Sequence, residues 1–119
     1  METGYDSSQY GNILDTDGSS PQGLTVRVLN TTLIDEYMVN HSRCRGSLRA
    51  WLADAEVAAW ATPTDVKARY PKASILSENR VVFDITGNRY RLLCRIAYKS
   101  AIVIVQRIGT HAEYSKWIL

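Results

Sequence analysis

The sequence of 119 residues predicts an α+β fold, with an N-terminal strand and two helices packed on one face of a small, mainly antiparallel sheet. Two observations support this class. Apolar residues recur at helical spacing in the first half of the chain and at a period of two in the second half. The composition, 45% hydrophobic and 22% charged, is typical of a water-soluble globular protein, and the length fits one domain with one core.

The first half of the domain is expected to combine one strand with helices. At residues 25–30, TVRVLN, alternating valines predict a short strand. Apolar residues then recur at helical spacing through residues 33–38, after an Asn-Thr-Thr cap signal, and again through residues 48–59. Residues 62–71, TPTDVKARYP, have an N-cap threonine, a proline at the first helical position and a second proline that closes one or two turns.

The second half alternates as the strands of a sheet do. Three strands are expected at residues 80–86, 89–98 and 101–109. Two-residue turns at residues 87–88 and 99–100 should connect them, so that the three strands form an antiparallel meander.

The alternation also predicts two different faces of this sheet. On the middle strand, the face assigned to the core beneath the helices carries Tyr90, Leu92, Cys94, Ile96 and Tyr98. The opposite face collects Arg80, Val82 and Asp84 from the first strand, Arg89, Arg91, Leu93, Arg95 and Ala97 from the second, and Val103, Val105 and Arg107 from the third. We call it the arginine face, after Arg80, Arg91, Arg95 and Arg107. Planar guanidinium groups bind phosphate bidentately, although arginines on a solvated sheet face are also routine.

The charge of the chain is divided unevenly. Residues 1–24 contain four acidic residues and no lysine or arginine, so all 14 basic residues lie in residues 25–119, against eight acidic ones. We interpret residues 1–24 as a disordered acidic tail, because their scattered apolar residues have no period, and residues 25–119 as the folded domain. The basic domain favours a polyanionic partner, either nucleic acid or a very acidic protein, with a solvated basic surface as the alternative.

No segment of the sequence indicates secretion or a membrane. Apolar runs are too short to span a bilayer, and the N-terminus lacks the basic start and apolar centre of a signal peptide. We therefore expect a cytoplasmic protein. Cys44 and Cys94 lack metal-ligand spacing, so we assign them to the core as reduced thiols, and we expect neither a metal nor a cofactor.

The stretch GTHAEYSKW, residues 109–117, follows the last strand beside the arginine face. Thr110 is placed to cap a short C-terminal turn of helix. In such a turn His111 can exchange a proton near neutral pH, and Tyr114, three residues later, shares its side of the helix. The alternative is a helix cap with an ordinary surface histidine, and the spacing leaves both interpretations open.

Four segments together resemble a known family. NRVVFDITGNRYRL (79–92) and IVIVQRIGTHAEYSK (102–116) resemble the C-terminal half of HigB-type toxins of the RelE superfamily, and DVKARYPKASIL (65–76) and SLRAWLADAEVAAW (47–60) also fit. The resemblance implies a RelE-like curved sheet with helices on one side and RNA on the other. Members are small bacterial endoribonucleases that are encoded beside a HigA antitoxin and cut mRNA on the translating ribosome.

The resemblance also implies roles for single residues. In metal-independent cleavage by attack of the ribose 2′-hydroxyl, Arg91 would stabilise the phosphate charge and His111 would act as general acid or base. Tyr114 would hydrogen-bond the phosphate or stack on a base. The expected RNA-binding cations are Arg80, Arg95, Arg107, Lys67 and Lys116. The family usually has an aspartate in place of Ser115, and a basic then an aromatic residue in place of Gln106 and Arg107.

Two other classes of function stay open at this level. A RelE-fold protein can act by binding alone, as the related ParE-type toxins do against DNA gyrase, and a degenerate toxin would only occupy an antitoxin. The expected partners are a HigA-like antitoxin, in a toxin–antitoxin hetero-oligomer, together with mRNA and the ribosome. The sequence does not indicate the cut site, the dependence on the ribosome or the role of residues 1–24.

Overall fold

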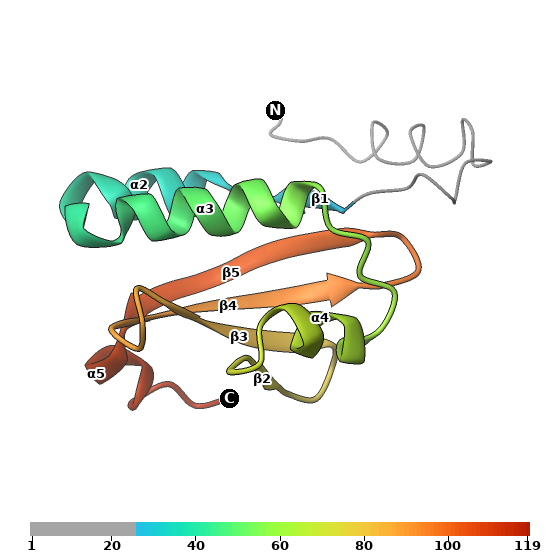
Figure 1. The fold of residues 1–119 in the computed structure, drawn as a ribbon. Coiled ribbons are helices and arrows are strands. Elements are labelled where there is room, and N and C mark those ends of the chain that lie inside the picture. Colours follow the sequence, from blue (N-terminus) through green and yellow to red (C-terminus); the bar gives the residue numbers. More distant parts are fainter. Residues whose placement is uncertain (1–25) are drawn as a thin grey trace.

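The computed structural model describes residues 26–119, which form a mixed five-stranded sheet with helices packed against it (Figure 1). The α+β class predicted from the sequence is confirmed. The expected acidic tail, residues 1–24, lies outside the described residues. Within the described part of the chain, no helix has both the length and the apolar character that crossing a membrane requires.

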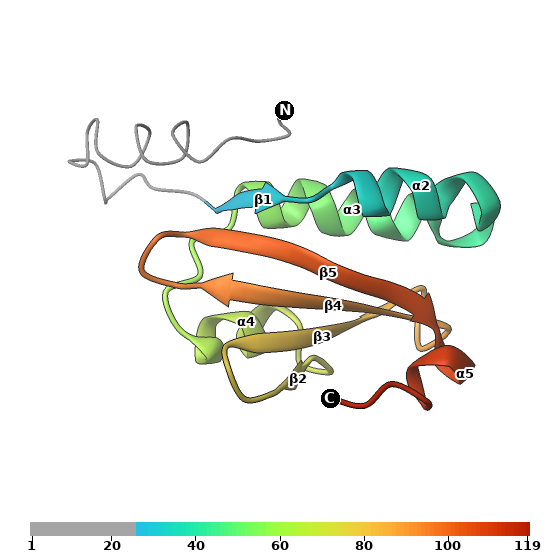
Figure 2. The ribbon, with the colours of Figure 1, turned by 180° about the vertical axis from the view of Figure 1, so that it is seen from behind.

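The sheet has the strand order β1-β5-β4-β3-β2, and three of its four pairings are antiparallel (Figures 1 and 2). The strands are β1 (Arg27–Leu29), β2 (Ser74–Ile75), β3 (Arg80–Ile85), β4 (Tyr90–Ala97) and β5 (Ile102–Thr110). Strands β3, β4 and β5 form the antiparallel meander that the sequence predicts. The N-terminal strand β1 pairs in parallel with β5 and forms one edge of the sheet. The other edge is β2, which the alternation did not predict because two residues carry no period.

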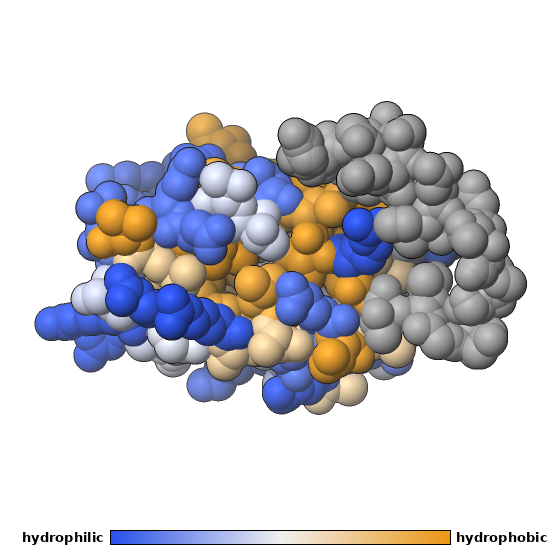
Figure 3. Space-filling view, turned by 90° about the horizontal axis from the view of Figure 1, so that it is seen from above, coloured by the Kyte–Doolittle hydropathy of each residue, from blue (hydrophilic) through white to orange (hydrophobic). Residues whose placement is uncertain are grey.

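The helices pack on one face of the sheet and enclose the core with it. They are α2 (Thr32–Asn40), the 3-10 turn η1 (Ser42–Cys44), α3 (Arg45–Glu56) and α4 (Pro63–Arg69). Fully buried side chains from both layers meet there, among them Ile34, Leu48, Val66, Phe83, Leu92 and Ile96. The face of β4 that was assigned to the core therefore packs against the helices, although Tyr98 lies in the turn after the strand. On the outside, Figure 3 shows hydrophilic residues gathered over the end where α2 and α3 meet.

Helix α4 begins as the sequence predicts. The hydroxyl of Thr62 accepts from the backbone N–H of Asp65 at 3.3 Å, and the Asp65 carboxylate accepts from the N–H of Thr62 at 3.1 Å. This reciprocal capping box satisfies two of the N–H groups that a helix start leaves unpaired. The prediction of a proline-led helix of one or two turns is thus confirmed.

Both cysteines are buried free thiols, as expected. Burial raises the pKa of each thiol, because the thiolate would lose its hydration. Cys94 lies between the sheet and the helices, and Cys44 donates through Sγ to the carbonyl of His41 at 3.1 Å. They act as small core groups at neutral pH.

Both hairpin turns are longer than the predicted two residues. The strands close at the pairs Ile85–Tyr90 and Ala97–Ile102, which leaves residues 86–89 and 98–101 to the turns. Thr86 and Ala101 take left-handed backbone angles, with φ of 55° and 56°. Side-chain alternation does not report φ, so these residues looked like strand in the sequence.

A β-bulge interrupts the pairing of β4 with β5. Leu93 pairs with Arg107, whereas the next residue, Cys94, pairs with Val105. Gln106 is therefore the extra residue on β5. A single inserted residue moves every later side chain of the strand to the other face.

The bulge corrects the predicted faces of β5. Before it, Val103 and Val105 are fully buried in the core and do not lie on the arginine face, where the alternation placed them. After it, Arg107 lies opposite Leu93 on the arginine face, and Ile108 packs against the core. Because of the bulge, β5 fills the core along most of its length and still adds an arginine to the other face.

Candidate functional site

The strand register assembles the arginine face. In the pairing of β3 with β4, Arg80 lies opposite Arg95 and Asp84 opposite Arg91. Directly opposed residues of antiparallel strands point to the same side of the sheet. Arg107 joins them from β5 after the bulge. The four predicted arginines therefore share the face opposite helices α2, α3 and α4.

Aromatic side chains of the C-terminal segment, residues 111–119, lie on this face. The guanidinium of Arg91 is 5.3 Å from the ring centroid of Tyr114, and that of Arg107 is 4.6 Å from the ring of Trp117. The two rings meet edge to face at 5.4 Å. Both contacts are within the range of cation–π attraction, so the arginines hold the segment in place.

The arginine face is consequently not the open surface that the alternation implied. Its apolar centre is covered, with Val82 only 1% and Leu93 only 6% exposed. The end of the segment is tied down as well, because Arg80 donates through Nη2 to the main-chain oxygen of Leu119 at 3.0 Å. What stays accessible are the rims of the face and the outside of the segment.

Arg91 is the most deeply buried of these arginines, with 9% of the residue exposed. Its Nε lies 3.2 Å from the Asp84 carboxylate, and its Nη1 donates to the carbonyls of Asn88 and Tyr90 at 2.7 and 3.2 Å. A buried guanidinium needs such partners to offset its lost hydration. Arg91 thus fixes the turn after β3 and presents its charge to Tyr114.

His111 is exposed at the start of α5 (His111–Tyr114). Thr110 caps this helix in a box with Glu113, with hydrogen bonds of 3.1 and 2.7 Å, and the N–H of His111 donates to the carbonyl of Arg89 at 2.8 Å. The predicted cap is confirmed. The backbone of the histidine is fixed while its imidazole faces solvent.

Gly109 lets the C-terminal segment lie this close to the strand. A Cβ at this position would stand 2.7 Å from Cζ2 of Trp117 and 3.0 Å from Oε1 of Glu113. Any larger residue would push the indole or the capping carboxylate away. The glycine of the GTHAEYSKW stretch is therefore a requirement of the close approach.

The remaining predicted cations divide into two groups. Arg95 forms an exposed ion pair with Glu78 at 3.3 Å, and Lys116 lines a pocket of about 350 Å³ beside Arg107 and Trp117. These lie at the rim of the arginine face. Lys67 lies on α4, where its Nζ donates to two carbonyls of the loop before β2 at 2.7 and 2.9 Å. The structure does not bring Lys67 to the other site residues.

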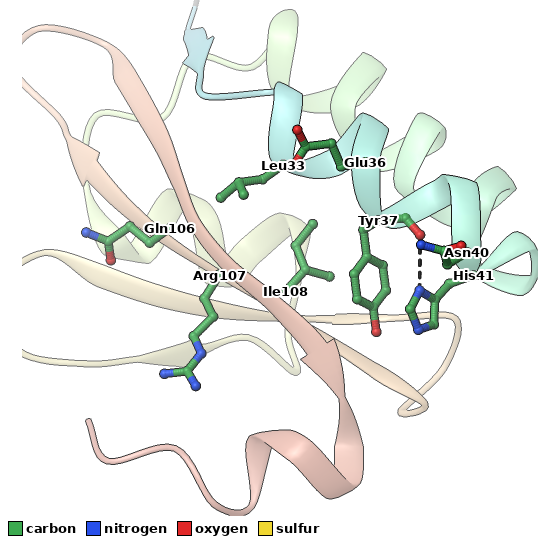
Figure 4. A pocket seen from close by; sticks show the side chains of 8 residues that line it. All are labelled: Leu33, Glu36, Tyr37, Asn40, His41, Gln106, Arg107 and Ile108. Atoms are coloured by element: carbon green, nitrogen blue, oxygen red, sulfur yellow. Dashed lines mark hydrogen bonds between the residues drawn. The ribbon is translucent and has the colours of Figure 1, made fainter.

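Sequence reasoning missed a cluster on the other side of β5. His41, at the end of α2, stacks on Tyr37 (Figure 4). Its ring also meets the edge of the Tyr90 ring. The side chains of His41 and Tyr37 line a pocket of about 320 Å³ together with Gln106 and Arg107. The spacing of four residues between Tyr37 and His41 was a signal for a shared helix face, but Tyr37 had been counted only as an apolar position.

Residues 44–117, well over half of the chain, match the family described as HigB toxin, the RelE-like toxic component of a toxin–antitoxin system. The matched range extends from the start of α3 to Trp117 and so includes the whole arginine face. Among curated proteins, no relative of the chain is found.

Proposed function

The chain belongs to the HigB toxin family, the RelE-like toxic components of toxin–antitoxin systems, and on this premise we propose that it is an endoribonuclease that cleaves mRNA. The observation that carries the proposal is the position of His111. Its imidazole is exposed on a capped turn, directly beside a face that concentrates four arginines. A proton-transfer group next to fixed positive charge is what phosphodiester cleavage requires.

The proposed reaction is attack of the ribose 2′-hydroxyl on the adjacent phosphate. The protein has to align the attack, stabilise the added negative charge and protonate the leaving 5′-oxygen. His111 exchanges the proton. Tyr114, held by the guanidinium of Arg91 at 5.3 Å, contacts the phosphate or an unpaired base. Arg91 is buried, so it acts through Tyr114 and through its charge.

The rim cations bind the RNA backbone in this proposal. Arg95, Arg80 and Lys116 are solvent-accessible at the edges of the arginine face, and Arg107 lies between two pockets. Their charges attract phosphates from either side of the cleavage position. Lys67 contributes only to the fold, because both its hydrogen bonds hold the loop before β2.

The family also implies a protein partner. A toxic component of a toxin–antitoxin system requires an antitoxin, and we propose a HigA-like protein that forms a hetero-oligomer with this chain in the cytoplasm. The substrate is proposed to be mRNA on the translating ribosome, where single-stranded RNA is presented in extended form.

Induced expression in cells, with and without His111→Ala, tests the proposed function. The native chain should stop growth and produce mRNA fragments with 5′-hydroxyl ends, which primer extension maps. His111→Ala should reduce the cleavage rate by about 10²–10⁴-fold, the usual effect of removing a proton-transfer group. Since the His111 side chain is exposed, the variant should have the melting temperature of the native chain and should still bind the antitoxin.

Two outcomes would contradict the proposal. Growth arrest without new mRNA ends would identify a toxin that acts by binding alone, like the ParE-type proteins. Unchanged cleavage by His111→Ala would leave RNA cleavage standing but remove the role of His111.

A further inference from the structure

A second histidine lies beside the candidate site. His41 is the C-cap residue of α2, and its ring borders the pocket of about 320 Å³ between α2 and β5 (Figure 4). The residue is half-buried. A cleavage by 2′-hydroxyl attack needs one group that accepts a proton and another that donates one, and the proposed function has so far assigned only His111.

The hydrogen bonding of His41 fixes its tautomer. Its Nδ1 lies 3.1 Å from the backbone carbonyl oxygen of Tyr37. A carbonyl oxygen only accepts, so Nδ1 carries the proton of the neutral ring and Nε2 keeps a lone pair. The ring also stacks on Tyr37, with centroids 3.8 Å apart and planes at 3°. The imidazole is therefore a proton acceptor held in one orientation.

The pocket of His41 is continuous with the arginine face. Arg107 and Ile108 line both this pocket and the neighbouring one of about 350 Å³, which the C-terminal segment completes through Glu113, Lys116 and Trp117. The guanidinium of Arg107 thus stands where the two pockets meet. A phosphate bound there would border the pocket that His41 lines.

The two histidines lie at the same end of β5. Tyr90, whose ring centroid is 6.2 Å from that of His41, is the strand partner of Thr110. Thr110 is the N-cap of α5, and His111 is the first residue of that helix. One aromatic residue and one strand pair therefore connect His41 to the start of α5.

Tyr37 adds a hydrogen-bond donor to this pocket. Its hydroxyl is buried and has no hydrogen-bond partner among the described residues. Burial, and after it the nearby negative charge of Glu113, raises the pKa of Tyr37 to about 12. The hydroxyl is thus neutral at physiological pH. A ligand oxygen in the pocket would satisfy this donor.

We propose that His41 is the general base of the RNA cleavage and that His111 is its general acid, an assignment that rests on the proposed function. Nε2 of His41 takes the proton of the ribose 2′-hydroxyl while the 2′-oxygen forms its bond to phosphorus. The bond from phosphorus to the 5′-oxygen breaks, and protonated His111 gives that oxygen a proton. The products are a 2′,3′-cyclic phosphate and a 5′-hydroxyl, and solvent restores both histidines.

Several charged or titratable groups surround the His41 ring and its pocket. They are Glu36 and Tyr37 on α2, Cys44 on η1, Tyr90 on β4, Arg107 on β5 and Glu113 on α5. All are kept in the variants below. A change in the pH dependence of cleavage then reports on the histidines themselves.

The simpler role for His41 is a helix cap, and the test separates the two roles. In His41→Asn the side-chain amide still offers an N–H donor near the position of Nδ1, so the bond to Tyr37 is kept while Nε2 is lost. In His41→Gln the amide instead takes the place of Nε2. Melting temperature and antitoxin binding should be close to those of the native chain in His41→Asn.

The measurement is the pH dependence of cleavage of ribosome-bound mRNA by the native chain, His41→Asn, His41→Gln and His111→Ala. The native rate should fall on both sides of its optimum. Both His41 variants should lose about 10²–10⁴-fold in rate and also the fall at acidic pH, which reports protonation of the base. His111→Ala should lose the fall at alkaline pH instead.

Three results would overturn the assignment. If His41→Asn cleaves mRNA at the rate of the native chain, His41 only caps α2. A lower rate that keeps the acidic fall would show that another group is the base. If the native chain itself does not cleave ribosome-bound mRNA, the proposed function fails, and this inference fails with it.

Discussion

The two faces of the sheet are held by different forces. On the helix face, apolar side chains such as Phe83 and Leu92 are fully buried, and they pack against Trp51 and Leu48 from α3. On the arginine face, two cation–π contacts and a hydrogen bond from Arg80 to Leu119 hold a nine-residue segment that contains one short helix. Both faces are covered, but only the first is covered by a core.

This difference suggests that the helix face stabilises the fold and that the arginine face serves the function. Buried apolar area stabilises a fold by about 25 cal/mol per Å², and it needs no charged group to do so. A buried arginine stabilises less than apolar packing of the same volume, because its desolvation offsets most of the attraction. Its presence beneath Tyr114 is better explained by the site than by stability. The following variants test this separation of stability from function.

The largest effect on stability is expected from neighbouring leucines on opposite faces. Leu92→Ala should lower the free energy of unfolding by about 2–5 kcal/mol, because it leaves a cavity between packed layers. Leu93→Ala should cost about half as much, since the short C-terminal segment can settle into the space. Thermal and denaturant unfolding of both variants measure the difference. Equal losses would show that the C-terminal segment is as rigidly packed as the helices.

The next largest effect concerns the ion pair of Arg91 and Asp84. Arg91→Ala leaves the Asp84 carboxylate, 21% exposed, without its partner. We expect a loss of about 2–3 kcal/mol, below the 3–5 typical of a fully buried pair. Adding Asp84→Ala should restore about 1 kcal/mol, measured as the coupling in a double-mutant cycle. Additive losses would mean that the pair is not coupled.

Sequence patterns predicted the elements well where one period governed them. The apolar residues of α2, α3 and β4 recur at a constant spacing, and Thr62 and Thr110 both carry the capping signal. The errors arose where a local backbone feature overrides the period. Gln106 shifts the register of β5 by one residue, and Thr86 and Ala101 turn the chain with positive φ. The spacing of the side chains contains no record of either feature.

For the candidate site, the sequence indicates which residues to consider but not how they are arranged. Arg91 and Tyr114 were singled out, yet their contact depends on how the C-terminal segment folds back over the sheet. Such a contact between distant residues leaves no periodic signal. His41 was missed for a related reason, because its neighbour Tyr37 fits the apolar pattern of α2 and only the tertiary structure brings Tyr90 and Arg107 next to them.

A smaller effect is expected from the two capping boxes, one on each face. Thr62→Ala should cost about 1 kcal/mol of stability and leave RNA cleavage unchanged. Thr110→Ala should cost less stability, because α5 has only four residues, but it should slow cleavage since it frees the backbone that positions His111. Melting curves and cleavage rates on the same preparations give both numbers. Equal rates for the two variants would show that the cap on α5 does not position the histidine.

The smallest effect on stability should come from removing one of two exposed ion pairs. The two pairs lie on opposite sides of the sheet. Arg95 pairs with Glu78 at the rim of the arginine face at 3.3 Å, and Arg69 pairs with Asp54 on the helix side at 3.0 Å. Exposed pairs contribute about 0–1 kcal/mol, so Arg95→Ala and Arg69→Ala should melt at nearly the same temperature. Each variant also lowers the net charge by one.

Binding of single-stranded RNA should nevertheless distinguish these two variants. If Arg95 contacts a phosphate, its loss should weaken affinity at low salt and reduce the slope of log affinity against log salt by about 0.7, the release expected for one contact to a single strand. Arg69→Ala has the same net charge and should keep the native slope. The measurement is a salt titration of RNA affinity for the native chain and both variants. If both variants change the slope equally, RNA responds to the total charge of the protein and not to the arginine face.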